Sequence, residues 1–334
     1  MYELVFSSQT NRWQHILDLF NLKDIYYTRE YLVSALKLDP GEAMLFYYID
    51  EDGHGETVYP FIKRQLMSEG SLFYDITSPF GYGGPVLKVR NDGYKLASNF
   101  LRIFEDFCKA EKIIAEYIRF HPVLNNAEFF IKQLDLITVY DTYTLQLNAY
   151  MSEAEQTTAE RADSGLIFKK LGTVKNMFDF LVLYYSTIRK REETDSYYFF
   201  TNDYFESLVS ALGPELHLFG AYKDHKLLTA SYVLTKGETI YHHLSGKSED
   251  ADLLEAEAVL LNNIAEWGAY NGFRYFHLAG KQPGSLTAEV EDSNKPYAVS
   301  SSTFFIARLV HDPEIYISTH PIEQTELIKR YGNV

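Results

Sequence analysis

Residues 215–280 read ELHLFGAYKDHKLLTASYVLTKGETIYHHLSGKSEDADLLEAEAVLLNNIAEWGAYNGFRYFHLAG, and this stretch decides the fold. Short apolar and β-branched runs in it predict strands, and turn residues separate them. A longer run with leucines at helical spacing, followed by Gly272, predicts a helix with a glycine cap. The predicted strands are 217–222, 227–235, 239–244 and 273–278, and the predicted helix is 252–271. The order of three strands, a helix and a strand indicates an α/β domain.

The first half of the chain repeats this plan. Five residues reappear as the same residue 173 positions later, in the same predicted elements: Thr28, Tyr31, Glu42, Leu45 and Phe46. So many matches in one register indicate a duplication of one unit. We therefore expect two tandem domains, residues 1–150 and residues 151–334, with Leu45-Phe46 and Leu218-Phe219 on equivalent strands.

Composition and charge exclude several classes of protein. The chain has 334 residues, a net charge of −15 and 46% hydrophobic residues, which fits two soluble domains. The acidic balance argues against a generic nucleic-acid surface, so no direct nucleic-acid binding is expected. One cysteine, Cys108, permits no intramolecular disulfide, and no run is long enough to span a membrane. A cytoplasmic location is the simplest expectation.

The most distinctive stretch is the glycine-rich loop Ser78-Pro79-Phe80-Gly81-Tyr82-Gly83-Gly84-Pro85. Glycine allows close backbone approach to a ligand or a positive φ, and the two prolines stiffen the ends of the loop. Such a loop before a helix can present main-chain N–H groups to an anion. The alternative is a rigid structural turn that closes one end of the sheet. The glycine spacing fits neither a Walker loop nor a dinucleotide-binding fingerprint.

Further motifs accompany this loop, so that the set comprises residues 74–85, 119–122 with Asn125, 241–245, 266–268 and 276–280. Together they resemble the FemAB/FemX-like family of the GNAT acyltransferase superfamily. The resemblance covers nearly the whole chain. It implies an α/β fold (α+β mixed) of two tandem GNAT-like domains, each a mixed twisted sheet flanked by helices.

The resemblance also implies a function. It points to an acyltransferase or aminoacyltransferase that moves its group onto an amine of a cell-wall, sugar-nucleotide or lipid-linked precursor bound between the domains. The alternative is a catalytically degenerate tandem-GNAT protein that binds a ligand or a partner protein. Acyl-CoA or aminoacyl-tRNA are the possible donors. The acidic loop 246–251 lacks the glycines that hold pyrophosphate, and residues 151–200 lack a coiled-coil arm, so no motif selects either donor.

The candidate site residues come from both halves. The predicted proton acceptors are His243, His121 and Asp75. The predicted substrate-binding residues are Tyr74, Ser78, Tyr82, Gly83, Gly84, Ser245, Gly246, Lys247 and Lys281. Structural roles compete with each assignment: a buried histidine, a turn carboxylate or a solvated lysine. His242 and His243 are consecutive on a strand, so they should point to opposite faces. No metal-binding motif is present.

Overall fold

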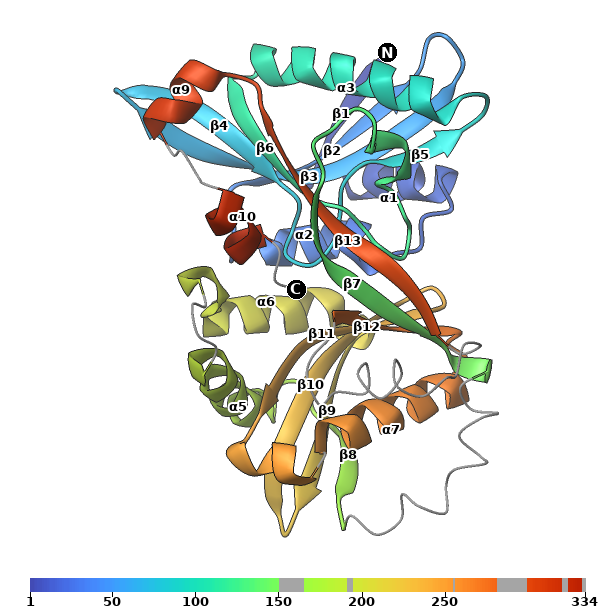
Figure 1. Cartoon of the computed structure of the whole chain (residues 1–334), viewed down its shortest axis with the longest axis vertical. Helices are drawn as coiled ribbons and strands as arrows, with labels where there is room; N and C mark the ends of the chain where they lie inside the picture. The colour runs from blue at the N-terminus through green and yellow to red at the C-terminus, as the bar shows by residue number, and fades with distance from the viewer. Residues whose placement is uncertain (150–164, 191–194, 255, 281–298, 320–323, 332–334) are drawn as a thin grey trace. The chain divides into compact units, whose positions relative to one another are not determined.

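The structure is a computed structural model that describes residues 1–149, 165–190, 195–254, 256–280, 299–319 and 324–331. It divides into two compact units, Met1–Val139 with Thr303–Val334, and Tyr140–Ser302 (Figure 1). The chain passes from the first unit to the second within strand β7 (Ile137–Gln146) and returns within β13 (Val299–Val310). The expected division at residue 150 differs from this one in the tail, which belongs to the first unit because β13 pairs with a strand there.

The first unit is built on a mixed sheet with strand order β1-β2-β3-β4-β6-β13, and β5 pairs with β3. Only β4 and β6 are parallel to each other; the other described pairs are antiparallel. Its strands are β1 Tyr2–Phe6, β2 Glu42–Ile49, β3 Gly55–Ser68, β4 Ser71–Thr77, β5 Val86–Val89 and β6 Ile113–Arg119. Its helices are α1 Thr10–Leu19, η1 Ile25–Tyr27, α2 Arg29–Ala35, α3 Gly93–Ala110, η2 Glu128–Phe130, α9 Pro313–Thr319 and α10 Gln324–Tyr331.

Helix α3 supplies the core on one face of that sheet. Asp92 caps its first turn by accepting hydrogen bonds from two main-chain N–H groups. The apolar residues that follow lie at helical spacing, so Phe100 and Phe104 point together at the strands. The ring of Phe104 lies 5.0 Å from that of Phe46 on β2 and 5.2 Å from that of Tyr59 on β3. Burying each of these Phe side chains contributes about 1.5–3 kcal/mol to the stability of the folded unit.

The second unit repeats the plan with strand order β7-β12-β11-β10-β9-β8. Here β11 and β12 form the parallel pair. Its remaining strands are β8 Ile167–Leu171, β9 Leu216–Lys223, β10 Lys226–Lys236, β11 Thr239–Lys247 and β12 Tyr275–Gly280. Its helices are α5 Met177–Lys190, η3 Ser196–Tyr198, α6 Asn202–Leu212, η4 Gly213–Glu215, η5 Glu249–Leu254 and α7 Ala256–Tyr270.

The two units carry equivalent elements in equivalent places. Strand β2 follows α2 and pairs with the next strand, as β9 follows α6 and pairs with the next strand. Phe46 packs on α3, and Phe219 packs on α7, with its ring 4.9 Å from that of Trp267. Both helices connect the two strands of a parallel pair. The prediction that Leu45-Phe46 and Leu218-Phe219 occupy equivalent strands is confirmed, and so is the tandem fold.

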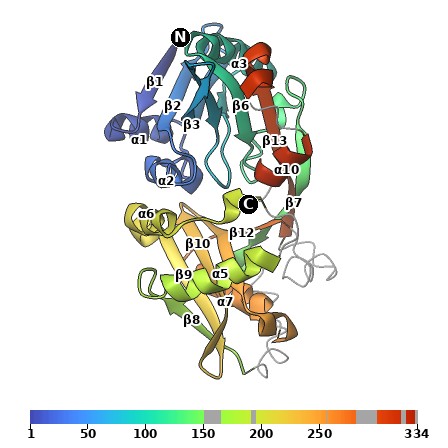
Figure 2. The same ribbon diagram turned by 90° about the vertical axis from the view of Figure 1, so that its left-hand side faces the viewer.

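Helices flank the strands of each unit in both views (Figures 1 and 2). In the part of the chain that the structure describes, no helix combines the length and the hydropathy that crossing a bilayer requires.

Candidate active site

The second unit has an opening in its pattern of strand pairing. Strands β11 and β12 pair only from Thr239–Tyr275 to Tyr241–His277. Beyond Tyr241 the register between them ends, although β11 continues to Lys247 and β12 stays paired with β7 as far as Gly280. Two parallel strands that part in this way present main-chain groups along both inner edges, where an extended ligand can pair.

A β-bulge lies at the point where the strands part. Val233 of β10 is opposite His242, whereas its neighbour Tyr232 is opposite Leu244. His243 is therefore the extra residue of the bulge. Bulges redirect side chains and are frequent beside active sites. The two consecutive histidines face different helices, which agrees with the expectation that they point to opposite faces.

His242 lies on the side of α7. Its Nε2 atom is 3.2 Å from the hydroxyl of Ser231 on β10. Burial lowers the pKa of His242, and the negative charge of Glu257 and a hydrogen bond to the main chain of Leu278 partly offset this. The imidazole is therefore neutral at neutral pH, with a carboxylate near enough to stabilise its protonated form. A neutral histidine beside a carboxylate is the arrangement of a general base.

His243 lies on the side of α6 and is less suited to that role. Its Nε2 atom is 3.2 Å from the hydroxyl of Tyr204. Burial, reinforced by His242, lowers the pKa of His243 to about 3. A base with so low a pKa accepts protons poorly near neutral pH. The sequence pointed to His243, and the geometry favours its neighbour.

The end of β11 is held by helices on both sides. A Cβ atom on Gly246 would lie 2.4 Å from the main-chain nitrogen of Tyr184, so this glycine permits α5 to pack directly on β11. The main-chain N–H of Lys247 donates to Thr187 of α5 at 2.8 Å. The ammonium of Lys247 lies 3.4 Å from Glu257, in the first turn of α7. Ser245 is half-buried opposite Ser231, and Lys281 lies outside the described residues.

The predicted loop of the first unit is a buried structural element. Tyr82 is 1% exposed, and its ring packs on Tyr26, His121 and Phe304. It therefore offers no stacking face for a ligand in this structure. Tyr74 sits on β4 beneath the ammonium of Lys63, which lies 4.1 Å from its ring centre.

The main-chain carbonyls of this loop are bonded within the unit. Tyr27 donates its hydroxyl to the carbonyls of Gly83 and Gly84, and Asn126 donates to those of Gly83 and Pro85. Ser78 is buried, and its hydroxyl accepts the main-chain N–H of Arg119. These contacts favour the rigid structural turn over the anion-binding loop.

His121 is also part of this support. Its Nδ1 atom accepts the main-chain N–H of Leu124 at 3.3 Å, which leaves the ring proton on Nε2. That atom faces a carboxylate oxygen of Asp24 at 3.2 Å, and the other oxygen of Asp24 caps η1 by accepting the N–H of Tyr26. Both side chains are buried. His121 thus ties the loop region to η1.

Asp75 is the predicted residue that lines a cavity. The cavity has a volume of about 240 Å³ and lies in the first unit, among β3, β4, β6, α9 and α10. Arg64 reaches into it and bonds both Asp75 and Asp39. Loop residues 78–84 and His121 do not line it. The cavity is smaller than the roughly 300–1,000 Å³ usual for small-molecule sites.

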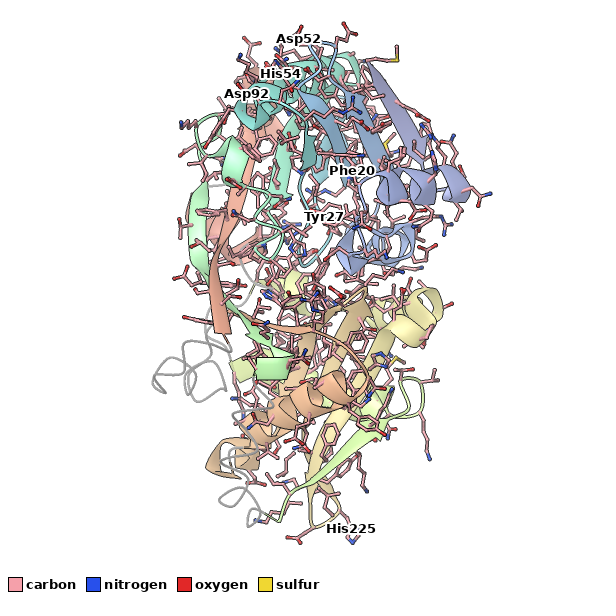
Figure 3. All side chains as sticks on the ribbon, turned by 90° about the vertical axis from the view of Figure 1, so that its right-hand side faces the viewer. Phe20, Tyr27, Asp52, His54, Asp92 and His225 are labelled. Atoms are coloured by element: carbon pink, nitrogen blue, oxygen red, sulfur yellow. The ribbon has the colours of Figure 1, made fainter. Side chains whose placement is uncertain are left out.

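One group of described side chains has the composition of a metal site. Asp50, Asp52 and His54 gather at the turn between β2 and β3, with Asp92 close by (Figure 3). Donors already occupy the carboxylate oxygens. Asp50 accepts from Tyr48, Asn99 and the main-chain N–H of His54, and Asp52 accepts from Asn99. These bonds make the aspartates part of a turn-stabilising network, while Nδ1 of His54 is buried without a hydrogen-bond partner among the described residues.

Known proteins resemble this chain in sequence over one segment and in fold over nearly all of it. Residues 154–287 match the family model of the acetyltransferase (GNAT) domain, and this range contains both β11 and α7. No curated protein matches the chain.

Solved structures share the fold of nearly the whole chain. The structure of FemX superposes with a TM-score of 0.59 at 12% identity, over 95% of this chain and 99% of FemX. A tandem GNAT protein from the clavulanic acid biosynthesis pathway gives 0.52 at 12% identity, over 94% and 99%. The C-terminal domain of a putative lysylphosphatidylglycerol synthetase from Agrobacterium fabrum gives 0.51 at 13% identity, over 92% and 93%. The chain therefore has the GNAT fold in two tandem units, and its residues 154–287 match the acetyltransferase (GNAT) domain.

Proposed function

We propose that the chain is a transferase that moves an acyl or aminoacyl group onto an amine of a cell-wall, sugar-nucleotide or lipid-linked precursor. The observation that carries the proposal is the parting of β11 from β12 beside the buried, neutral His242. The fold is shared with FemX and with a domain of a putative lysylphosphatidylglycerol synthetase, which favours acceptors of this kind.

The residues of the second unit supply each step of such a transfer. The acceptor amine attacks the carbonyl carbon of the donor, and its nitrogen forms the new C–N bond. The attacking nitrogen loses its proton to the imidazole of His242, and Glu257 stabilises the resulting imidazolium. Main-chain N–H groups at the inner edge of β11 stabilise the oxyanion. Breaking the bond to the leaving group regenerates the carbonyl, and the histidine returns the proton to that group.

Two kinds of donor compete, acyl-CoA and a carrier-linked aminoacyl group. The segment before α7 forms η5, where Glu249 pairs with Lys190 at 3.0 Å and Asp250 pairs with Lys226 at 2.6 Å. Lys247 is paired with Glu257. The cations of this region thus already have acidic partners, which disfavours tight binding of a pyrophosphate. We expect weak binding of acetyl-CoA, with a carrier-linked aminoacyl group as the better donor.

The alternative is a degenerate protein that binds a ligand or a partner protein without turnover. The low pKa of His243 and the pairing of Lys247 favour it, because both remove predicted site functions. The two proposals differ in one observable: a transferase forms a new amide.

The test is a product assay with purified protein. Acyl-CoAs and aminoacyl-tRNAs are supplied as donors with an amine-bearing muramyl peptide nucleotide or an aminated lipid as acceptor, and mass spectrometry detects the amide. The proposal expects an amide with one donor class and a loss of about 10²–10⁴-fold in His242→Gln. His225→Asn, in the exposed β9–β10 turn, is the matched control (Figure 3). If ligands raise the Tm but no donor gives any product, the chain is instead a degenerate protein that binds without turnover.

A further inference from the structure

Helix α5 of the second unit has an apolar face in solvent. Phe178 is 73% exposed and Val182 is 54% exposed, one helical turn further on. Val174, in the turn before the helix, is 70% exposed. The opposite face is buried among the strands through Phe180, Leu181, Tyr184 and Ile188, so α5 is already anchored without the exposed residues. Figure 2 shows α5 lying across the strands of the second unit.

The apolar face is bordered by cations, in contrast to the rest of the chain. The described residues 165–190 contain five Lys or Arg and one acid, Asp179, whereas the whole chain has a net charge of −15. Arg189 lies seven residues after Val182, so it continues the same face of α5. Lys169, Lys175 and Arg189 are all exposed.

The other charges near α5 leave this border cationic. Lys190 pairs with Glu249, and Lys170 lies 4.8 Å from the ring of Trp267, on the side of the sheet that α7 covers. The ammonium of Lys169 lies over the ring of Tyr222. Burial raises the pKa of Tyr222, and the charge of Asp179 adds to this rise. Within the described residues 165–190, the three cations Lys169, Lys175 and Arg189 therefore outnumber the one carboxylate, Asp179.

We propose that this face of α5 docks the second unit on an anionic phospholipid bilayer. This inference rests on the proposed function, because docking would bring the unit to a lipid-linked acceptor. Phe178, Val182 and Val174 enter the boundary between head groups and acyl chains, and the three cations contact the phosphates. An exposed apolar stripe with lysine and arginine at its edges is the pattern of interfacial helices. Anionic lipids attract such cations at close range.

A second copy of the chain fits this face less well. In a symmetric dimer the same patch meets itself, so Arg189 and Lys175 of one copy would approach those of the other. Like charges brought together in this way oppose association. The charge of the face thus favours lipid phosphates over self-association.

The test is co-sedimentation of the full chain with vesicles, which requires no turnover. The vesicles contain phosphatidylcholine alone or with about one third phosphatidylglycerol, at low salt and at about 0.5 M salt. Binding is expected only to the anionic vesicles, and it should weaken at high salt. Phe178→Ser with Val182→Ser should lower the affinity by roughly tenfold or more. Arg189→Gln with Lys175→Gln should remove the preference for phosphatidylglycerol.

The matched control is Tyr270→Ser, because Tyr270 is 92% exposed on α7 of the same unit but lies outside the stripe. It should bind vesicles as the unaltered chain does. Absence of sedimentation with anionic vesicles overturns the proposal, as does unchanged binding by the double serine variant. A concentration-dependent dimer that the serine variant dissociates, without lipid binding, also overturns it. Transfer to a water-soluble acceptor should survive in the serine variant, so failure here is separable from failure of the proposed function.

Discussion

The guanidinium of Arg64 donates to both carboxylate oxygens of Asp75, at 2.7 and 2.8 Å. The two residues are directly opposite each other on β3 and β4. The same guanidinium donates to Asp39 at 2.7 Å and to the hydroxyl of Tyr331, from α10, at 3.1 Å. Arg64 therefore joins two strands, the loop after α2 and the C-terminal helix. The carboxylate of Asp75 is committed to this network and is not available to orient an amine.

Asp75→Asn should destabilise the first unit rather than abolish catalysis. The side chains of Arg64 and Asp75 are only 13% and 9% exposed, and removing one partner of a buried ion pair costs about 3–5 kcal/mol. Urea denaturation measures the loss, and the transfer rate per folded molecule should stay unchanged. Glu51→Gln, at an exposed pair with the N-terminus, should change stability by less than about 0.5 kcal/mol. Loss of activity at unchanged stability would instead make Asp75 catalytic.

Two glycines with the same backbone conformation test how tightly the glycine-rich loop is packed. Gly84 has φ +80° and Gly53 has φ +78°. An added Cβ at Gly84 would lie 3.0 Å from Ile118, whereas at Gly53 it meets nothing within 4 Å. Gly53→Ala should cost about 1 kcal/mol from backbone strain alone, and Gly84→Ala should cost about 1–3 kcal/mol more through overpacking. Equal losses in urea denaturation would show that the loop yields easily and is not a rigid turn.

The sequence predicts the repeated core well because its strands and helices carry local signals. The run at 239–244 is short and largely apolar or aromatic, as a strand buried on both faces should be, and the structure extends it to Lys247 as β11. Short edge strands lack such signals. Strand β1 is only five residues long, and two lysines interrupt β8. Residues 128–130 form only the 3-10 turn η2, and Asn125 before it has φ +48°.

Features that depend on distant pairing are the ones that the sequence leaves undetermined. The position of β13 beside β6 joins the chain end to the first unit, and no local pattern records it. The site shows the same limit. The glycines, prolines and aromatic residues of loop 78–85 suit a ligand site and a rigid turn equally. The preference for His242 over His243 follows from the carboxylate of Glu257 beside His242, a neighbour that only the fold brings there.

The buried His243 should make the chain less stable in acid. Burial lowers its pKa from 6.5 in the unfolded chain to about 3. Between these values the unfolded chain binds a proton that the folded chain does not, so stability is full above pH 6.5 and falls as the pH drops toward 3. One such group changes the free energy of unfolding by about 1.4 kcal/mol per pH unit in this range. The urea midpoint of His243→Gln should vary less between pH 7 and pH 5, whereas His225→Asn should retain the dependence. An unchanged slope in His243→Gln would refute the burial argument.

His242 should set the acid limb of the pH–rate profile for transfer. The base must be neutral, and burial places the pKa of His242 below 6.5, so its protonation should lower kcat/KM only below about pH 6.5. The acceptor ammonium adds a separate limb at higher pH, which should move when an acceptor of different amine pKa is used. His243→Gln should keep the acid limb, because its neighbour remains. If His242→Gln retains that limb with only a modest loss of rate, another group accepts the proton and the assignment of His242 fails.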